Sequence, residues 1–256
     1  MKKLQLFLFG ALIFGNALAQ KTPKVQDKSV KAPVNIKIDG KAIEWDNKFQ
    51  AYNPASRIFY TLSNDSENLY LITRMEEQNG NFKAIGRGIT LTIQPPKGAM
   101  SKDKKPLVIT YPTKGKVDER DKIHDLVHWV YSLKDNKRKR DSVQNITNKM
   151  MATTFKHIDV SGLTDISEAS IPVYNLQEIR VAANINDEAQ YVYELAIPLK
   201  YISFLSDNNG TVNYSIKVNA PAEGVGLMVK DPSRLNPDAL YQLYSTDFSG
   251  EYTLSK

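Results

Sequence analysis

The chain of 256 residues contains no cysteine. This absence excludes disulfides, thiolate nucleophiles, lipid-modified cysteines, zinc ribbons and iron–sulfur clusters. Tryptophan and histidine are scarce, with two and three copies respectively. The sequence also lacks a Gly-x-Ser-x-Gly elbow, a Walker loop and a Gly-x-Gly-x-x-Gly fingerprint, so the motifs of serine-hydrolase and nucleotide-dependent chemistry are missing.

Hydrophobic residues make up 41% of the chain and aromatic residues 9%, whereas glycine and proline are present in only 13 and 12 copies. This composition favours a globular protein with a large core over a fibrous or disordered one. After residue 19, no apolar run approaches the length of about 18 residues that a membrane-spanning helix needs. We therefore expect no membrane span in the remainder of the chain.

The amino end has the layout of a secretory signal peptide. Two lysines precede an apolar run from Leu6 to Gly15, and an Ala-x-Ala site ends at Ala19. We expect cleavage of residues 1–19 and an exported protein, periplasmic or secreted. Residues 20–33 are polar, rich in lysine and interrupted by two prolines, which predicts a flexible leader. A single domain at 34–256 would follow.

Period-two alternation of apolar and polar residues predicts several strands with one buried face. The segments are Arg57–Leu62, Asn68–Met75, Arg87–Ile93, Glu178–Ile185, Gln190–Ile197 and Thr211–Asn219. Turn signals lie between them, at Asn64-Asp65, Asn79-Gly80-Asn81 and Asn208-Asn209-Gly210. Short amphipathic strands joined by such turns predict a mainly β protein, an antiparallel β-sandwich of jelly-roll or immunoglobulin-like type.

A short helical excursion is expected in the middle of the chain. The first helix, Asp121–Lys134, carries apolar residues with i, i+3, i+4, i+7 spacing at Ile123, Leu126, Val127, Val130 and Leu133. The second, Asp141–Met151, would begin at a cap formed by Asp141 or Ser142. We expect it to direct Val143, Ile146, Met150 and Met151 inward.

The middle of the chain is also strongly basic. Between Lys97 and His157 there are 15 Lys or Arg residues against 7 Asp or Glu, including the run KRKR at 137–140. No aromatic residues interleave with this run in the way that a nucleic-acid surface requires, and an exported protein seldom meets nucleic acid. We interpret the run as a solvated helix end or loop and expect no nucleic-acid partner.

Several motifs resemble those of family 9 carbohydrate-binding modules and the related DOMON-like β-sandwiches. The chain reads IKIDGKAIEW from Ile36, RIFYTLSND from Arg57 and NLYLITRM from Asn68. The likeness continues in GITLTI from Gly88, YELAIPLKYI from Tyr193 and the terminal TDFSGEYTLSK. The resemblance implies an antiparallel sandwich that binds carbohydrate, often with structural calcium.

The opening motif has a structural interpretation in the residues themselves. Asp39 can accept backbone N–H bonds in a turn that Gly40 makes sterically easy. Glu44 and Trp45 form the Glu-Trp pair of the motif, and the large apolar Trp45 would close the edge of the sandwich. The alternative is that Trp45 is exposed as a ligand platform.

The resemblance also implies a sugar held between two exposed tryptophans, but the chain has only Trp45 and Trp129. If Trp45 is structural, the two-tryptophan clamp is missing. Trp129, with Tyr131 beside it on the first expected helix, is then the candidate ligand platform. Packing of Trp129 into the core is the alternative.

Metal ligands are suggested at two places. His124 and His128 are one helical turn apart, as in the zinc motif His-Glu-x-x-His, with Asp125 in the place of the catalytic glutamate. Ordinary surface histidines are the alternative. The turns Asn64-Asp65-Ser66 and Asp207-Asn208-Asn209 offer clustered oxygens of the kind that calcium prefers, although such turns form without a metal as well.

Three hypotheses about function remain. The first is an exported, non-catalytic sandwich that binds a polysaccharide or cell-envelope glycan, and it predicts solvent-facing aromatic residues in a groove. The second is a structural or partner-binding envelope protein without sugar binding, with the basic helices as its contact surface. The third is a metal-assisted hydrolase at His124 and His128, which requires a third ligand close to both imidazoles.

Overall fold

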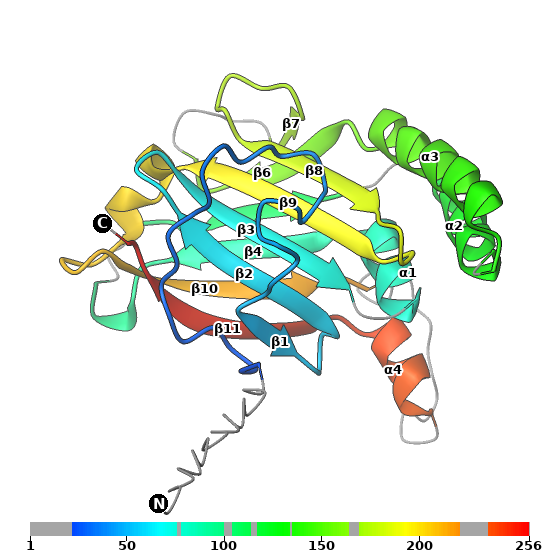
Figure 1. Ribbon diagram of the computed structural model, residues 1–256. Helices are drawn as coiled ribbons and strands as arrows, with labels where there is room; N and C mark the ends of the chain where they lie inside the picture. The colour runs from blue at the N-terminus through cyan, green and yellow to red at the C-terminus, as the bar shows by residue number, and fades with distance from the viewer. Residues whose placement is uncertain are drawn as a thin grey trace, which may run out of the picture.

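The computed structural model describes residues 22–75, 78–99, 104–113, 117–133, 135–163, 169–220 and 235–255. The expected signal peptide at residues 1–19 lies outside them. Within these ranges the protein is mainly β, with two antiparallel sheets (Figure 1).

The strands are β1 Ala51–Asn53, β2 Ile58–Asn64, β3 Asn68–Met75, β4 Ile89–Gln94, β5 Leu107–Tyr111, β6 His157–Ser161, β7 Ser170–Pro172, β8 Arg180–Ile185, β9 Tyr191–Pro198, β10 Thr211–Val218 and β11 Thr246–Thr253. The helices are α1 Gln78–Arg87, α2 Val117–Ser132, α3 Lys137–Thr154 and α4 Pro237–Leu243.

The two sheets confirm the antiparallel sandwich that the alternating segments predict. One sheet has the strand order β1-β2-β3-β9-β8, and the other has the order β11-β10-β4-β5-β6-β7. All strand pairs are antiparallel. The edge strands β1 and β11 lie at one side of the sandwich, and the edge strands β7 and β8 lie at the other (Figure 1).

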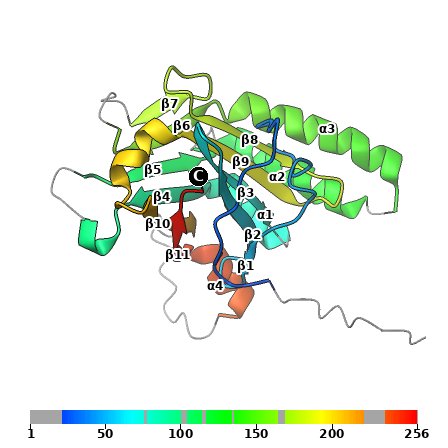
Figure 2. The same ribbon diagram turned by 60° about the vertical axis from the view of Figure 1, so that its left-hand side comes forward.

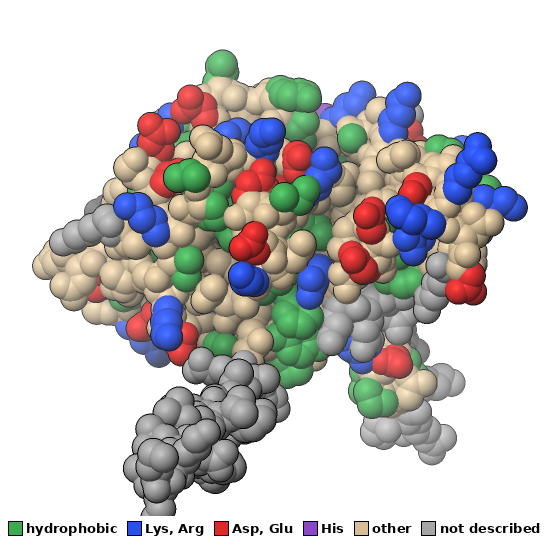
Figure 3. All heavy atoms as spheres, viewed as in Figure 1, with side chains coloured by type: hydrophobic (Ala, Val, Ile, Leu, Met, Phe, Trp, Pro, Cys, Tyr) green, Lys and Arg blue, Asp and Glu red, His purple; other side chains and the backbone are tan. Residues whose placement is uncertain are grey.

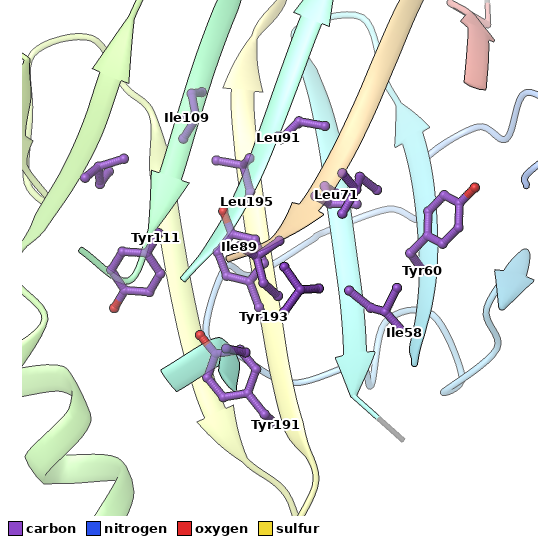
Figure 4. Packing of buried hydrophobic residues seen from close by; sticks show 14 of the residues in the cluster. Ile58, Tyr60, Leu71, Ile89, Leu91, Ile109, Tyr111, Tyr191, Tyr193 and Leu195 are labelled. Atoms are coloured by element: carbon purple, nitrogen blue, oxygen red, sulfur yellow. The ribbon is translucent and has the colours of Figure 1, made fainter. Parts of the chain in front are cut away.

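The core lies between the sheets and is filled by one face of each strand. In β10 burial alternates along the whole strand, so that Val212, Tyr214, Ile216 and Val218 are buried, as the alternation in the sequence predicts. The other sheet contributes large side chains such as Tyr193 and Leu195 (Figure 4). Burial of this apolar area is the main stabilising contribution to the fold.

The two helices predicted in the middle are present and lie side by side next to β8 (Figures 1 and 2). In α2, Ile123, Val127 and Val130 are fully buried. α3 begins four residues earlier than predicted, because the side chain of Asn136, and not Asp141 or Ser142, caps it by accepting from Lys139 N–H.

One prediction about the buried face of α3 was wrong. Ile146 is 53% exposed, and Thr147 is buried in its place between Val143 and Met151. The helix is rotated because Asn148 binds the backbone of Ile185 in β8 through both its amide oxygen and its amide nitrogen. These bonds direct Ile146 to the solvent.

Helix α1 occupies the place of the predicted turn Asn79-Gly80-Asn81, so that prediction was wrong. The side chain of Asn81 explains the helix: it is fully buried, donates to the carbonyl of Ala189 and accepts from Tyr191 N–H. The helix ends at Arg87, and Gly88, which follows it, has a left-handed φ of +82°. A Cβ there would lie 2.4 Å from the carbonyl oxygen of Pro112, so only glycine fits.

The amino-terminal segment is held against the sandwich where the composition predicts a flexible leader. Figure 1 shows it crossing the molecule along the edge near β11 and the outer face of the front sheet. The side chain of Gln26 is 5% exposed and makes hydrogen bonds of 2.8 Å with both the N–H and the carbonyl of Leu62. Ala32 N–H donates to the carbonyl of Asn64. No helix in the described part of the chain is long and apolar enough to cross a membrane.

Candidate functional site

The Asp39-Gly40 turn is bound by a buried carboxylate on β9, that of Glu194. Both backbone N–H groups of the turn donate to Oε2 of Glu194, at 2.9 and 2.8 Å. Asp39 Oδ1 accepts from Lys41 N–H, as expected of such a turn, and Gly40 has a φ of +78°. The turn therefore fastens the amino-terminal segment to the outer face of β9.

Glu194 is fully buried and has a strongly altered acidity. Burial raises its pKa to about 8, the two N–H donors oppose this effect, and the charges of Asp39 and Glu44 add to it. Its second oxygen, Oε1, has no hydrogen-bond partner in the described part of the protein.

Trp45 lies in a second apolar cluster, on the outer face of the five-stranded sheet. It is 8% exposed and packs with Ala42, Tyr70 and Val192, among others. Glu44 is half-buried beside it. Trp45 is thus a packing residue between the amino-terminal segment and β3 and β9, not an exposed platform.

The structure separates the two candidate platform residues on α2. The ring of Trp129 is exposed, at 51%. Tyr131 points to α1, where its hydroxyl oxygen accepts from the side chain of Asn81 at 2.8 Å. Residues two apart on a helix face different directions, so the two rings do not form one surface.

The two histidines of α2 are close to each other and to a phenylalanine of α1. Their ring centroids are 5.5 Å apart, and Phe82 lies 3.7 Å from the ring of His124 and 4.3 Å from that of His128. Burial and the nearby His128 lower the pKa of His124. Among the described residues no group of three or more His, Cys, Asp or Glu side chains is arranged to hold a metal, so the third ligand required for hydrolysis is not found there.

The two turns suggested as calcium ligands line one cavity of about 450 Å³. Their carboxylates are engaged with the protein itself. Asp65 Oδ1 accepts two backbone N–H groups and Oδ2 accepts from Tyr70, while Asp207 Oδ1 accepts from Asn209 and Thr211 N–H. These oxygens stabilise the turns.

A buried lysine lies near α4. Burial, together with the charge of Arg57, lowers the pKa of Lys83 to about 8. Its ammonium lies 4.0 Å from the ring centroid of Tyr241 and 3.2 Å from Thr246 Oγ1. The side chain connects α1 with α4 and β11, which is a structural role.

Two hollows of the described surface lie where β7 and β8 form the edges of their sheets. A cavity of about 790 Å³ lies between β8, the end of α3 and the strands β6 and β7. A second cavity, of about 780 Å³, lies between the start of β3, the end of β9 and the loop that precedes β8. Val173, Tyr174 and Arg180 line both cavities. We name the two cavities together the Tyr174 groove.

Tyr174 stands on a loop that one asparagine side chain holds in place. The amide nitrogen of Asn175 donates to the carbonyls of Pro172 and Ile179, at 3.0 and 2.8 Å, and its amide oxygen accepts from Ile179 N–H. Tyr174 is 94% exposed and Leu176 is 93% exposed on this loop. A loop bridged by the Asn175 side chain therefore presents an aromatic ring to the solvent beside two cavities.

The charges around the groove are only partly neutralised. Glu178 pairs with Lys200 at 3.2 Å, and Asp39 pairs with Lys41 at 3.4 Å. The exposed side chains of Arg180 and Lys156 form no hydrogen bond or ion pair with any described residue.

The groove was not found by sequence reasoning. Tyr174 is one of 13 tyrosines, and nothing in its local pattern marks it as exposed. The signal that could have indicated the loop is the Pro172–Asn175 segment, since proline and asparagine are both typical of turns. Glu194 was missed because the alternation in Gln190–Ile197 predicts one buried face and puts Glu194 on the other. In the structure β9 is buried at every position, since the amino-terminal segment covers its outer face.

Comparisons with protein-family models, with curated proteins and with solved structures find no match for this chain. The class that the structure defines is a mainly β protein with two antiparallel sheets and a pair of helices beside them. The resemblance to carbohydrate-binding modules rests on the sequence motifs.

Proposed function

We propose that the protein is an exported, non-catalytic β-sandwich that binds a polysaccharide or cell-envelope glycan in the Tyr174 groove. The observation that carries the proposal is the exposed ring of Tyr174, which lines two cavities on a loop whose backbone Asn175 bridges. An aromatic face matches the apolar C–H face of a pyranose ring. Both cavities have the volume of ordinary ligand sites.

The polar lining of the groove fits the same ligand. The side chains of Asn68 and Asn184 lie on its walls together with Arg180. Amides and cations can donate hydrogen bonds to sugar hydroxyls, which accept as well as donate. The motifs at Ile36–Trp45 give independent support, because they resemble those of carbohydrate-binding modules.

Affinity electrophoresis against a panel of soluble polysaccharides tests the proposal. We expect one glycan class to retard the purified protein and Tyr174→Ala to weaken this binding about tenfold, since an aromatic contact contributes about 1 kcal/mol beyond its buried area. Trp129→Ala is the matched control, because it removes an exposed aromatic residue from α2. The double variant of His124 and His128 to Ala should also bind normally.

The outcomes separate the hypotheses. If Trp129→Ala abolishes retardation and Tyr174→Ala does not, the glycan site lies on α2 and not in the Tyr174 groove. If none of the polysaccharides retards the protein, glycan binding is excluded for that panel and the proposal fails.

A second candidate function is partner binding in the cell envelope through the α2–α3 pair. Its support is that both helices expose a large apolar side chain, Trp129 at 51% and Ile146 at 53%. Lys and Arg side chains gather along the outer edge of the helices at the right of Figure 3. A crosslinked complex in envelope fractions that disappears with Trp129→Ala and Ile146→Ser, but not with Tyr174→Ala, would favour this function.

A further inference from the structure

We infer that the glycan bound in the Tyr174 groove is an acidic polysaccharide whose carboxylates are bound by Arg180, with Lys156 as a second cation. The inference rests on the proposed function and names the substrate class of the same site. It arises from where the unpaired charges of the groove lie.

Arg180 lies in the wall that the two cavities share, next to Tyr174. It begins β8, where its partner in β9 is Ala196, a residue of the cluster on the outer face of the sheet. Its charge lies close enough to Tyr70 to oppose the rise in the pKa of that hydroxyl, which burial and Asp65 bring to about 12. An exposed guanidinium at this position is available to a ligand in either cavity.

The carboxylates that line the groove do not neutralise this cation. Glu178 is engaged by Lys200 and Asp39 by Lys41. Glu67 is the remaining carboxylate of the lining, and it belongs to the second cavity only. Lys156 lines the first cavity together with Arg180, and His157 follows it in the chain. The first cavity therefore has an excess of positive charge.

The chemistry of these groups favours a carboxylate over a neutral hydroxyl. The planar guanidinium presents parallel N–H donors that match the two oxygens of a carboxylate, and such charge-assisted bonds are about twice as strong as neutral ones. Tyr174 beside it offers an apolar face to the sugar ring. A uronate residue carries both features, a pyranose face and a carboxylate.

The test compares each acidic polysaccharide with its own methyl ester, which has the same backbone without the charge. Polygalacturonate, alginate and hyaluronan serve as probes in affinity electrophoresis with the purified protein. We expect at least one of them to bind about tenfold more tightly than its ester. Arg180→Gln should weaken this binding about tenfold, and Arg180→Lys should restore only part of it, because lysine keeps the charge but loses the fork.

Lys139→Gln is the matched control, because it removes the same charge from an exposed position on α3 outside the groove. Equal losses with Arg180→Gln and Lys139→Gln would show non-specific attraction to a basic protein and overturn the inference. Dextran sulfate is a further arm: binding of equal strength and equal dependence on Arg180 would overturn the assignment to carboxylate.

The failure of this inference can be told from the failure of the proposed function. If the acids and their esters bind equally, and Tyr174→Ala abolishes both, the glycan site stands and its preference for acidic glycans is refuted. If no acidic, esterified or neutral polysaccharide binds in a manner that depends on Tyr174, both the proposed function and the inference fail. The urea unfolding midpoint of Arg180→Gln checks that this variant is still folded.

Discussion

Glu194 shows how one buried side chain makes the stability of the protein depend on pH. Its pKa is raised from an ordinary value of 4.5 to about 8, chiefly by burial. An acid with a raised pKa in the folded state contributes stability that is fully present below its unfolded pKa. This contribution is lost as the pH rises through the folded pKa. The protein should therefore lose free energy of unfolding between about pH 4.5 and pH 8.

Glu194→Gln removes this titration and keeps an oxygen that can accept from the N–H groups of Asp39 and Gly40. We expect the variant to resemble the wild type at pH 5 and to be more stable than it at pH 9. The difference should be a few kcal/mol, since one pKa unit corresponds to about 1.4 kcal/mol. Urea unfolding at pH 5, 7 and 9 measures it, and equal pH dependence in the two proteins would contradict the prediction.

The loop between β7 and β8 is the element on which the proposed site depends. Asn175→Ala removes the amide that bonds to Pro172 and Ile179. We expect a loss of about 1–2 kcal/mol of stability and faster hydrogen exchange at the Ile179 amide. Glycan binding should weaken as well, because a mobile loop must be ordered on binding.

Asn209→Ala is the control for this prediction, since it also changes an asparagine in an exposed turn, one that is outside the Tyr174 groove. It should leave binding unchanged. Unaltered exchange at Ile179 in Asn175→Ala would mean that the loop does not need this side chain.

Strands and helices with a strong periodic pattern could be predicted from the sequence, and the other elements could not. Asn68–Met75 has the same bounds in the sequence pattern and in β3, although both faces of that strand are buried. In β10 every second residue is buried, as its alternation predicts. α1 contains Gly80 and Gly86, and glycine is a poor helix former, so its formation depends on tertiary bonds of Asn81. Local sequence does not contain such contacts.

The same limit applies to the candidate site. The turn at Asp39 and Gly40 could be predicted because both residues act locally. Tyr174 and Arg180 lie on the β7–β8 loop and at the start of β8, whereas Lys156 follows α3, so Lys156 meets the other two only in the folded protein. Their proximity is set by strand order, which a single sequence does not reveal.

At the scale of the whole molecule, the two sides of the sandwich differ. Residues 22–33 cover the side where β1 and β11 form the edges: Tyr252 of β11 donates to the carbonyl of Val30, while Gln26 bonds to Leu62 of β2. The opposite side, between β7 and β8, is hollowed by the larger cavity of the groove. A covered edge protects backbone groups from pairing with other chains, whereas the open side is available to a ligand.

This arrangement predicts that the amino-terminal segment contributes to folding and not to binding. Gln26→Ala leaves the N–H and the carbonyl of Leu62 without the partners that they have in the folded protein. Since unsatisfied buried polar groups are costly, we expect a loss of about 2–3 kcal/mol in the free energy of unfolding. Lys28→Ala, which changes an exposed side chain in the same segment, should alter stability by less than about 0.5 kcal/mol. Glycan binding by folded Gln26→Ala should equal that of the wild type, because the groove lies at the other edge. An unchanged urea midpoint for Gln26→Ala would show that the segment is the flexible leader that its composition predicts.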